Sequence, residues 1–363
     1  MVSISLLLYK PGFYLRPCLK SIFRQSFRDF ELLVIDNHSA DGTAQKAEEI
    51  LKSEAGRINW RLIINDKNTG FAAGHNLGIR EARGEFILLL NQDVVLDKDF
   101  LKNIIEVFQR DSKIGAIQGK LLRLKVAGQN LEESDLIDTT GLEIFKNRRI
   151  VARGQGQKDE GQFEKTEEIF GADGAAPVFR KAALEDVKLP VRLRPACGGT
   201  SADAQFSDSA GGGEKIGEYL DEDFFMYKED VDLAWRLRLL GWKAVFEPKA
   251  VAWHARTAGE SAAKNYWGIL RERRKIGNLA KYFSFKNQRL MQIKNEQGGL
   301  LLKHLPWFLP KEIASWIYVL IFEHYIFRTI KDFFHQVPRA WQKKKIIMAR
   351  QRVGAKEMEV WFK

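Results

Sequence analysis

Two hydrophobic patterns alternate along residues 2–119. Short runs rich in leucine and β-branched residues recur, and the segments between them carry apolar residues three or four positions apart. The first pattern is typical of buried strands and the second of helices that cover a sheet. The predicted strands are 2–9, 30–36, 59–65, 84–91 and 114–119, and the predicted helices are 17–25, 43–51, 72–82 and 100–108. This repetition predicts an α/β fold with a mainly parallel central sheet flanked by helices.

The regular alternation stops after the fifth strand. Residues 121–168 are polar and contain several glycines, which favours loops or a short hairpin. A short strand, a glycine turn and a helix are expected within 168–184, and a flexible Gly/Ser-rich loop at about 196–217. An acidic turn and a helix that ends at Gly241 follow. Residues 242–255 predict a final pair of short strands.

The last hundred residues differ in character. We expect a first domain at 1–260 and a second, helical region at 261–363 that is rich in aromatic and basic residues. The apolar stretch 313–321 is too short for a membrane span of about 20 residues. Basic residues at 271–275 and 343–345 flank it. This composition suits helices that lie on an anionic membrane surface, although helices packed on the first domain would read similarly.

Charge and cysteine content narrow the partners and the compartment. The chain has 58 Lys and Arg against 47 Asp and Glu, a formal net charge of +11. An anionic partner is therefore favoured: nucleic acid, a phosphorylated small molecule or an acidic membrane. The two cysteines, Cys18 and Cys197, form no disulfide framework, and the short apolar run at the N-terminus has no cationic segment before it. We therefore expect a cytoplasmic protein.

Polar residues gather where predicted strands end. Asp36, residues 68–76 and residues 91–93 each follow a strand, and residues 222–232 open a later helix. Any one of these could be an ordinary turn or helix cap. Ligands of open α/β sheets bind at the carboxyl ends of the strands, so the four together predict a binding edge. The chain has no GxGxxG or GxxxxGK[ST] motif, and a divalent metal on Asp93 is the alternative way to hold phosphates.

Four ordered motifs resemble a known family. They are DNHSADGT at 36–43, NTGFAAGHNLGI at 68–79, LLLNQD at 88–93 and DEDFFMYKEDVDLAWRLRLLGW at 221–242. Over about residues 2–260 the chain is similar to the inverting family-two glycosyltransferases, most of all to the rhamnosyltransferase-like subgroup. The resemblance implies the Rossmann-like GT-A fold. The composition of the last hundred residues adds the expectation of a C-terminal helical extension that associates with membranes.

The resemblance also implies where the donor and metal bind. The donor nucleotide would contact Asp36, Asn68, Gly70, Gly74, Asn76 and Asn91. Asp93 matches the last position of the DXD motif, and its carboxylate would bind Mg²⁺ or Mn²⁺ on the sugar-nucleotide diphosphate. Asn91 stands at the first position of that motif, so Asp93 is its only carboxylate. His254 matches a histidine that completes the metal site, although a lone histidine is also commonly structural.

The acceptor side is implied in the same way. Asp230 matches the catalytic base, with Asp232 as the alternative, and Asp173 and Glu229 would contact the acceptor. In a helix that begins near Glu229, Asp230 can face the cleft, whereas Asp232 is better placed to satisfy the opening amides of the helix or to pair with Arg236 four residues later. A single base is sufficient for one inverting displacement.

The leading hypothesis is therefore an inverting glycosyltransferase on the cytoplasmic face of the cell membrane. It would move a sugar, with rhamnose from dTDP-rhamnose as the first choice, to a lipid-linked or cell-surface polysaccharide. A sugar-phosphate nucleotidyltransferase would need a Gly-rich, basic signature after the first strand, where only Lys10 and Gly12 occur. A non-catalytic nucleotide-sugar-binding or scaffold protein is the third possibility. Nucleic acid is not expected as a partner, because it leaves the strand-end residues without a purpose.

Overall fold

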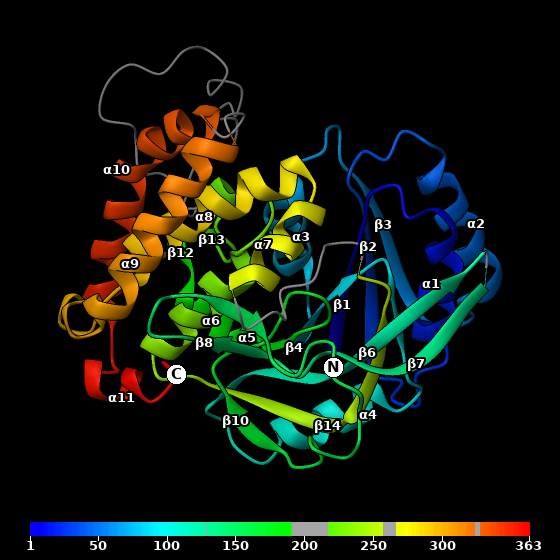
Figure 1. The fold of residues 1–363 in the computed structure, drawn as a ribbon. Coiled ribbons are helices and arrows are strands. Elements are labelled where there is room, and N and C mark those ends of the chain that lie inside the picture. The colour runs from blue at the N-terminus through cyan, green and yellow to red at the C-terminus, as the bar shows by residue number, and fades with distance from the viewer. Residues whose placement is uncertain (129, 191–216, 257–265, 324–326) are drawn as a thin grey trace, which may run out of the picture.

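The computed structural model describes residues 1–128, 130–190, 217–256, 266–323 and 327–363 (Figure 1). The flexible loop predicted at about 196–217 lies outside these residues except for its last position.

The first half of the chain forms the parallel part of a ten-stranded sheet. Its strands are β1 (Val2–Leu8), β2 (Phe30–Asp36), β3 (Asn59–Ile64) and β4 (Phe86–Asn91). They lie in the order β4-β1-β2-β3, and each neighbouring pair is parallel. All four strands were predicted. Because they run in one direction, their carboxyl ends share one edge, where Leu8 pairs with Asp36 and Leu7 with Asn91.

The other half of the sheet is mixed. Its strands are β5 (Val94–Leu96), β6 (Ile114–Ala127), β7 (Asn130–Thr139), β10 (Glu167–Ile169), β11 (Val178–Arg180) and β14 (Lys243–His254). β11 joins the halves, because it is antiparallel to both β4 and β6, and β14 is parallel to β6. Two small ladders stand apart: β8 (Leu142–Ile144) with β9 (Ile150–Ala152), and β12 (Leu189–Pro190) with β13 (Gly217–Glu218).

Helices cover both faces of the sheet. They are α1 (Leu15–Phe23), α2 (Thr43–Glu54), α3 (Gly70–Glu81), α4 (Phe100–Phe108), α5 (Lys181–Val187) and α6 (Glu229–Leu239), with short 3₁₀ turns at Gly12–Tyr14 and Glu222–Phe224. Side chains alternate between the faces of a strand. In β4, Leu88 and Leu90 therefore pack with α1, α2 and α4, whereas Ile87 and Leu89 share a cluster with α3, α5 and α6.

Two segments differ from the prediction. Residues 242–255 contain one strand, β14, and not two; its register shifts between Glu247 and Val251, so Pro248 is accommodated in the irregularity without ending the strand. Residues 121–127 and 130–139 form most of a long antiparallel hairpin of β6 and β7, where loops or a short hairpin were expected. β7 reads as a loop because its sequence, NLEESDLIDT, is mostly polar.

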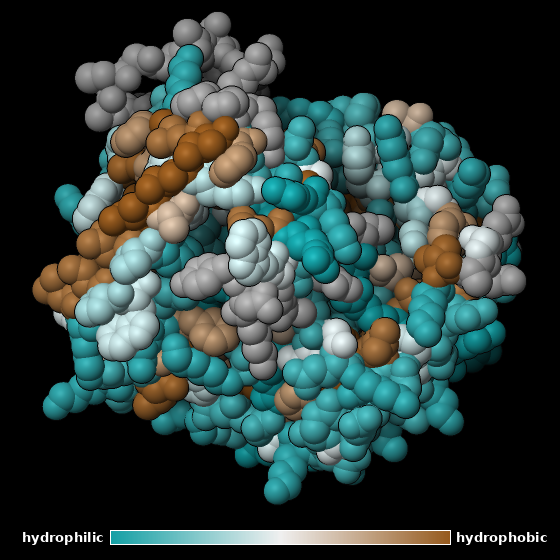
Figure 2. All heavy atoms as spheres, in the orientation of Figure 1, coloured by the Kyte–Doolittle hydropathy of each residue, from teal (hydrophilic) through white to brown (hydrophobic). Residues whose placement is uncertain are grey.

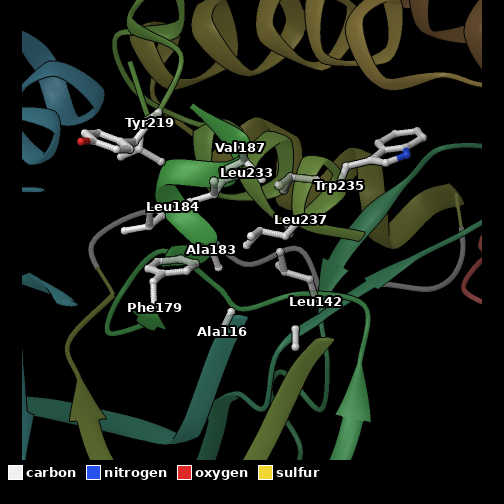
Figure 3. Packing of buried hydrophobic residues seen from close by; sticks show 14 of the residues in the cluster. Ala116, Leu142, Phe179, Ala183, Leu184, Val187, Tyr219, Leu233, Trp235 and Leu237 are labelled. Carbon is white, nitrogen blue, oxygen red and sulfur yellow. The ribbon is translucent and has the colours of Figure 1, made fainter. Parts of the chain in front are cut away.

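The C-terminal region is helical, as predicted. Its helices are α7 (Tyr266–Lys275), α8 (Asn278–Asn295), α9 (Gly298–Phe322), α10 (Phe327–Arg350) and α11 (Ala355–Glu359). Met291, Ile347 and Phe362 belong to the same buried cluster as Trp235 of α6. Figure 3 shows the part of this cluster around Trp235, and Figure 1 shows the C-terminal helices beside α6. The region thus shares a core with the sheet.

Candidate active site

Two strand ends bring Asp93 and His254 together. Asp93 lies between β4 and β5, and β5 pairs antiparallel with the end of β14, so that Val94 lies opposite His254. The backbone N–H of Ala255 donates to the Asp93 carbonyl oxygen at 3.0 Å. Asp93 Oδ1 and His254 Nε2 are consequently 3.4 Å apart. The two predicted metal ligands therefore face each other at the sheet edge.

A second carboxylate lies behind His254. The fully buried Asp138, near the end of β7, accepts a hydrogen bond from His254 Nδ1 at 2.8 Å. Burial alone would lower the pKa of His254, but the carboxylates of Asp93 and Asp138 outweigh burial and raise this pKa to about 9. Burial would raise the pKa of Asp93, and the same histidine holds that pKa below its ordinary value. The bond to Asp138 fixes the ring so that Nε2 faces Asp93.

These residues fit a metal ion that arrives with a diphosphate. Within the described ranges, no three His, Cys, Asp or Glu side chains form a complete metal cage. Mg²⁺ is commonly held by one or two carboxylates together with phosphate oxygens and water. Metal-binding histidines usually donate their other ring N–H to a carboxylate, which is the contact between His254 and Asp138. Asp93 and His254 therefore supply part of a coordination shell that phosphate oxygens could complete.

Arg256 extends this network toward α6. Its Nε donates to Asp138, and its Nη2 lies 3.4 Å from Asp173 Oδ2. Asp138 and Arg256 were not among the predicted site residues. Asp36 was singled out because it stands at the carboxyl end of a predicted strand. Asp138 lies near the carboxyl end of β7, but this strand was not predicted. Recognition of β7 would therefore have made Asp138 a candidate.

Asp230 lies in the first turn of α6, as predicted, and faces the loop that contains Gly174. Asp230 Oδ2 accepts a hydrogen bond from the Gly174 N–H at 3.2 Å, and a Cβ on Gly174 would lie 3.3 Å from the Asp230 Cβ. Burial first, and the nearby Asp173 carboxylate second, raise the pKa of Asp230 to about 6. The group is therefore ionised at neutral pH but remains a stronger base than an ordinary aspartate.

The two acidic neighbours of Asp230 have different environments. Glu229 is buried, and burial together with the Asp230 charge raises the pKa of Glu229 to about 8, so it is protonated at neutral pH. Asp232 is fully buried and accepts hydrogen bonds from Arg236 Nε at 3.0 Å and Lys294 Nζ at 2.9 Å. The predicted pairing with Arg236 is confirmed. Asp232 holds α6 and α8 together and does not face a cleft.

The end of β4 contacts three parts of the site through successive residues. The Asn91 N–H donates to the Ala175 carbonyl oxygen at 2.9 Å, which ties the strand to the loop facing α6. The Gln92 amide bonds both the N–H and the carbonyl of Tyr9, at 2.6 and 3.0 Å. Asp93 then faces the histidine of β14. This run therefore anchors β1, the α6-facing loop and β14 at one point.

Asn37 organises the loop before α3. Its Nδ2 donates to Asn68 Oδ1 at 3.0 Å and to the Gly70 carbonyl oxygen at 3.1 Å. The neighbouring Asp36 carboxylate accepts hydrogen bonds from the N–H and the hydroxyl of Ser39. Asp36 therefore makes the turn contact that the sequence had left open as an alternative. The predicted donor residues Asp36, Asn68 and Gly70 lie close together at the ends of β2 and β3.

Two predicted donor residues are corrected by the structure. Asn76 is fully buried in α3; its Nδ2 donates to the Leu220 carbonyl oxygen and to Glu222 Oε1, and its Oδ1 accepts two backbone N–H groups of the same segment. Gly74 is buried against β1, where a Cβ would lie 2.6 Å from Leu7 Cδ1. Asn76 thus has no amide atom left for a nucleotide, and Gly74 permits close helix–strand packing.

A comparison with known families identifies the first half of the chain. Residues 8–188 match the family described as Glycosyl transferase family 2. The chain contains a glycosyl transferase family 2 domain. The matched range includes Asp36, Asp93 and Asp173, whereas Asp230 and His254 follow it. The family 2 domain has the mixed α/β GT-A fold, as the resemblance implied.

Individual relatives are distant. The chain is 23% identical over 256 residues to "Poly-beta-1,6-N-acetyl-D-glucosamine synthase" of Staphylococcus epidermidis, a match that covers 69% of this chain and 49% of that protein. The chain thus spans about half the length of the curated relatives it matches. Staphylococcus aureus TarS 1–349, solved with UDP-GlcNAc, is similar with a TM-score of 0.51 and 15% identity, covering 96% of this chain and 90% of TarS 1–349. GalNAc-T7, solved with UDP, GalNAc and Mn²⁺, has a TM-score of 0.53 and 13% identity, covering 88% and 57%. At these identities the likeness concerns the fold.

Proposed function

We propose that this chain is an inverting, metal-dependent glycosyltransferase that moves a sugar from a nucleotide-diphosphate donor to a glycan or lipid-linked glycan. The observation that carries the proposal is the connected edge of the sheet. The Asp93–His254 pair is linked through Asp138 and Arg256 to the loop that approaches Asp230. A site for a metal-bound diphosphate and a base for an acceptor hydroxyl therefore lie in one network.

Asp93 and His254 would hold Mg²⁺ or Mn²⁺, and that ion would neutralise charge on the departing diphosphate. Asp36, Asn68 and Gly70 are the proposed contacts of the nucleoside, with Asn91 beside the metal. GalNAc-T7, a structural neighbour, was solved with UDP and Mn²⁺, which supports the choice of ion.

Asp230 is the proposed base. Its carboxylate would take the proton of the acceptor hydroxyl as that oxygen attacks the anomeric carbon, while the bond from this carbon to the diphosphate breaks. One such displacement inverts the configuration. The pKa of about 6 keeps Asp230 ionised at neutral pH. Asp173 and the protonated Glu229 are the proposed acceptor contacts, because they adjoin Asp230 on the loop and on the helix.

For the donor we propose dTDP-rhamnose, on the motif resemblance to rhamnosyltransferase-like enzymes. UDP-GlcNAc is the second candidate, because TarS was solved with it and a curated relative is named for an N-acetylglucosamine polymer. A thermal-shift screen of dTDP-rhamnose, UDP-GlcNAc and GDP-mannose, each with and without Mn²⁺, tests the proposal, since a bound ligand raises the apparent stability. Stabilisation by none of these sugar nucleotides would contradict it. Stabilisation without any transfer or donor hydrolysis would favour the non-catalytic alternative.

We further propose that α9 rests on the inner face of the cell membrane, which would present a lipid-linked acceptor. By length and composition α9 could cross a membrane, and only 11% of its most apolar window is buried. Leu302, Trp307 and Ile317 are each at least half exposed. Figure 2 shows the apolar stripe that α9 forms on the surface. A stripe of this kind suits the boundary between headgroups and acyl chains.

The basic residues near α9 are only partly available to a membrane. Lys343, one of the three lysines expected to flank the apolar stretch, is buried and pairs with Glu218 at 2.6 Å and with Asp221 at 2.5 Å. Lys345 and, in α7, Arg274 are exposed. The expected electrostatic contribution of the cluster at 343–345 is therefore smaller than the sequence suggested, because a buried lysine cannot contact lipid headgroups.

A further inference from the structure

A strained segment directly precedes α6. Phe225, Tyr227 and Lys228 have φ values of +62°, +69° and +75°. Residues other than glycine rarely adopt such φ values, because this backbone conformation is strained when a Cβ atom is present. Strain of this kind persists only where the surroundings enforce it. The segment ends one residue before Glu229 and two before Asp230, so whatever enforces this conformation also determines where α6 begins.

Helix α8 binds this segment from one side. Lys286 Nζ donates to the Asp223 carbonyl oxygen at 3.0 Å. Asn287, which is fully buried, donates through Nδ2 to three carbonyl oxygens, those of Phe224, Met226 and Tyr227, at 2.9, 2.9 and 2.8 Å. Because an amide nitrogen carries two hydrogens, one of them is shared. Among the described residues Asn287 Oδ1 has no hydrogen-bond partner, so the side chain acts here as a donor.

Helix α3 binds the remaining carbonyl. The Phe225 carbonyl oxygen accepts hydrogen bonds from the N–H groups of Phe71 at 2.7 Å and Ala72 at 3.2 Å. Gly70, at φ +83°, comes so close that a Cβ there would lie 2.5 Å from the Phe225 ring. Every carbonyl from residue 223 to residue 227 is thus bound, four of them by α8 and one by α3.

We infer that Asn287 is a positioning residue for Asp230. It holds three carbonyls of the strained segment, and the conformation of this segment sets the direction in which the first turn of α6 presents Asp230 to the loop at Gly174. The inference rests on the proposed function, because it requires Asp230 to be the base. It also assigns a role in the site to α8, which begins at Asn278, after the proposed metal ligand His254 and far beyond the family match at 8–188.

Asn295 provides a matched control. It lies on the same helix, is also fully buried, and donates its amide to Asp232 Oδ1 at 2.8 Å, not to the strained segment. Asn287→Ala and Asn295→Ala therefore remove the same group from the same helix. Misplacement of a reacting group by about 1 Å can cost about 100-fold in rate. For Asn287→Ala we expect kcat to fall by roughly 10- to 100-fold with the donor KM changed less than about threefold, and for Asn295→Ala we expect kcat to be retained.

The outcomes separate this inference from the proposed function. Unchanged kcat in Asn287→Ala, or an equal fall in Asn295→Ala, would overturn the inference. If Asn287→Ala does not fold, Asn287→Gln keeps the donor amide but displaces it, and wild-type kcat in that variant would overturn the inference as well. Asp230→Asn, measured alongside, tests the base itself, and wild-type turnover in this variant would refute the proposed base. If Asp230→Asn loses turnover while Asn287→Ala keeps normal kinetics, only the positioning role is refuted.

Discussion

Replacement of Asp230 by asparagine should lower the catalytic rate and raise the stability of the protein. Asparagine keeps the size of the side chain and can still accept the Gly174 N–H, but it cannot take a proton. A positioned general base contributes about 10²- to 10⁴-fold to rate. We therefore expect kcat of Asp230→Asn to fall by that order while donor affinity stays within about threefold, because the proposed donor contacts lie at the ends of β2 to β4.

The pKa of Asp230 predicts a gain in stability for the same variant. The pKa of about 6 in the folded protein lies above the ordinary aspartate value of 3.8. A raised carboxyl pKa means that the folded chain binds the proton more tightly than the unfolded chain, so the ionised group lowers stability above pH 6, and this penalty disappears as pH falls from 6 to about 4. Two pKa units correspond to about 3 kcal/mol. Allowing for partial exposure of Asp230, Asp230→Asn should gain roughly 1–3 kcal/mol in unfolding free energy at pH 7, and little at pH 4.

Two assays check this. Chemical denaturation at pH 7 and pH 4 measures the unfolding free energy of both proteins, and the pH dependence of kcat measures the base. Wild-type kcat should fall about twofold at pH 6 and about tenfold at pH 5, because protonation removes the base. A variant that turns over within threefold of wild type, or that loses stability at pH 7, would refute the assignment and its electrostatic reasoning respectively.

Three further outcomes are expected. Asp93→Ala should abolish transfer and, by titration calorimetry, the effect of Mn²⁺ on donor affinity, with cooperative unfolding retained; unchanged metal-dependent donor affinity would show that the ligand lies elsewhere. Asp232→Asn should lose about 3–5 kcal/mol in denaturation, because a buried ion pair with Lys294 is broken; a fully stable but inactive protein would instead point to Asp232 as the base. Ile317→Glu and Ile321→Glu should weaken sedimentation with anionic vesicles, and wild-type binding should fall with salt, because charges are screened within about 10 Å at 0.1 M; equal binding to neutral and anionic vesicles would contradict the electrostatic part.

The parallel half of the sheet was predictable mainly because three of its four strands, β1, β2 and β4, are buried. β1 and β2 are buried along their whole length, and buried strands read as continuous apolar runs. β7 has a largely polar sequence, and β14 is interrupted at Pro248. The local sequence therefore did not predict either strand correctly, because both are stabilised by pairing with β6. β14 continues past the proline because β6 pairs with it on both sides of the irregularity.

The site was predictable only where a residue stands at a strand end or a helix start. Asp93 and Asp230 satisfy this condition, and both lie where the sequence placed them. Asn76 has the right spacing after Asn68, but a sequence cannot reveal that its amide is fully used by the segment at 219–222. Arg256 was missed because its role comes from Asp138, which lies 118 residues away in the chain.

The shared core also decides how membrane binding can be tested. Phe362 packs against Trp235 of α6 with the ring centroids 5.7 Å apart, and Lys343 pairs with Asp221 in the acidic turn before that helix. Removal of the helices from residue 300 onward would therefore uncover α6 and leave the buried Glu218 without Lys343, so donor binding and membrane binding would be lost together. The exposed face of α9 avoids this problem, because Ile317 is half exposed and its replacement leaves the core contacts intact. Point substitutions on α9 can thus separate membrane binding from folding, whereas truncation cannot.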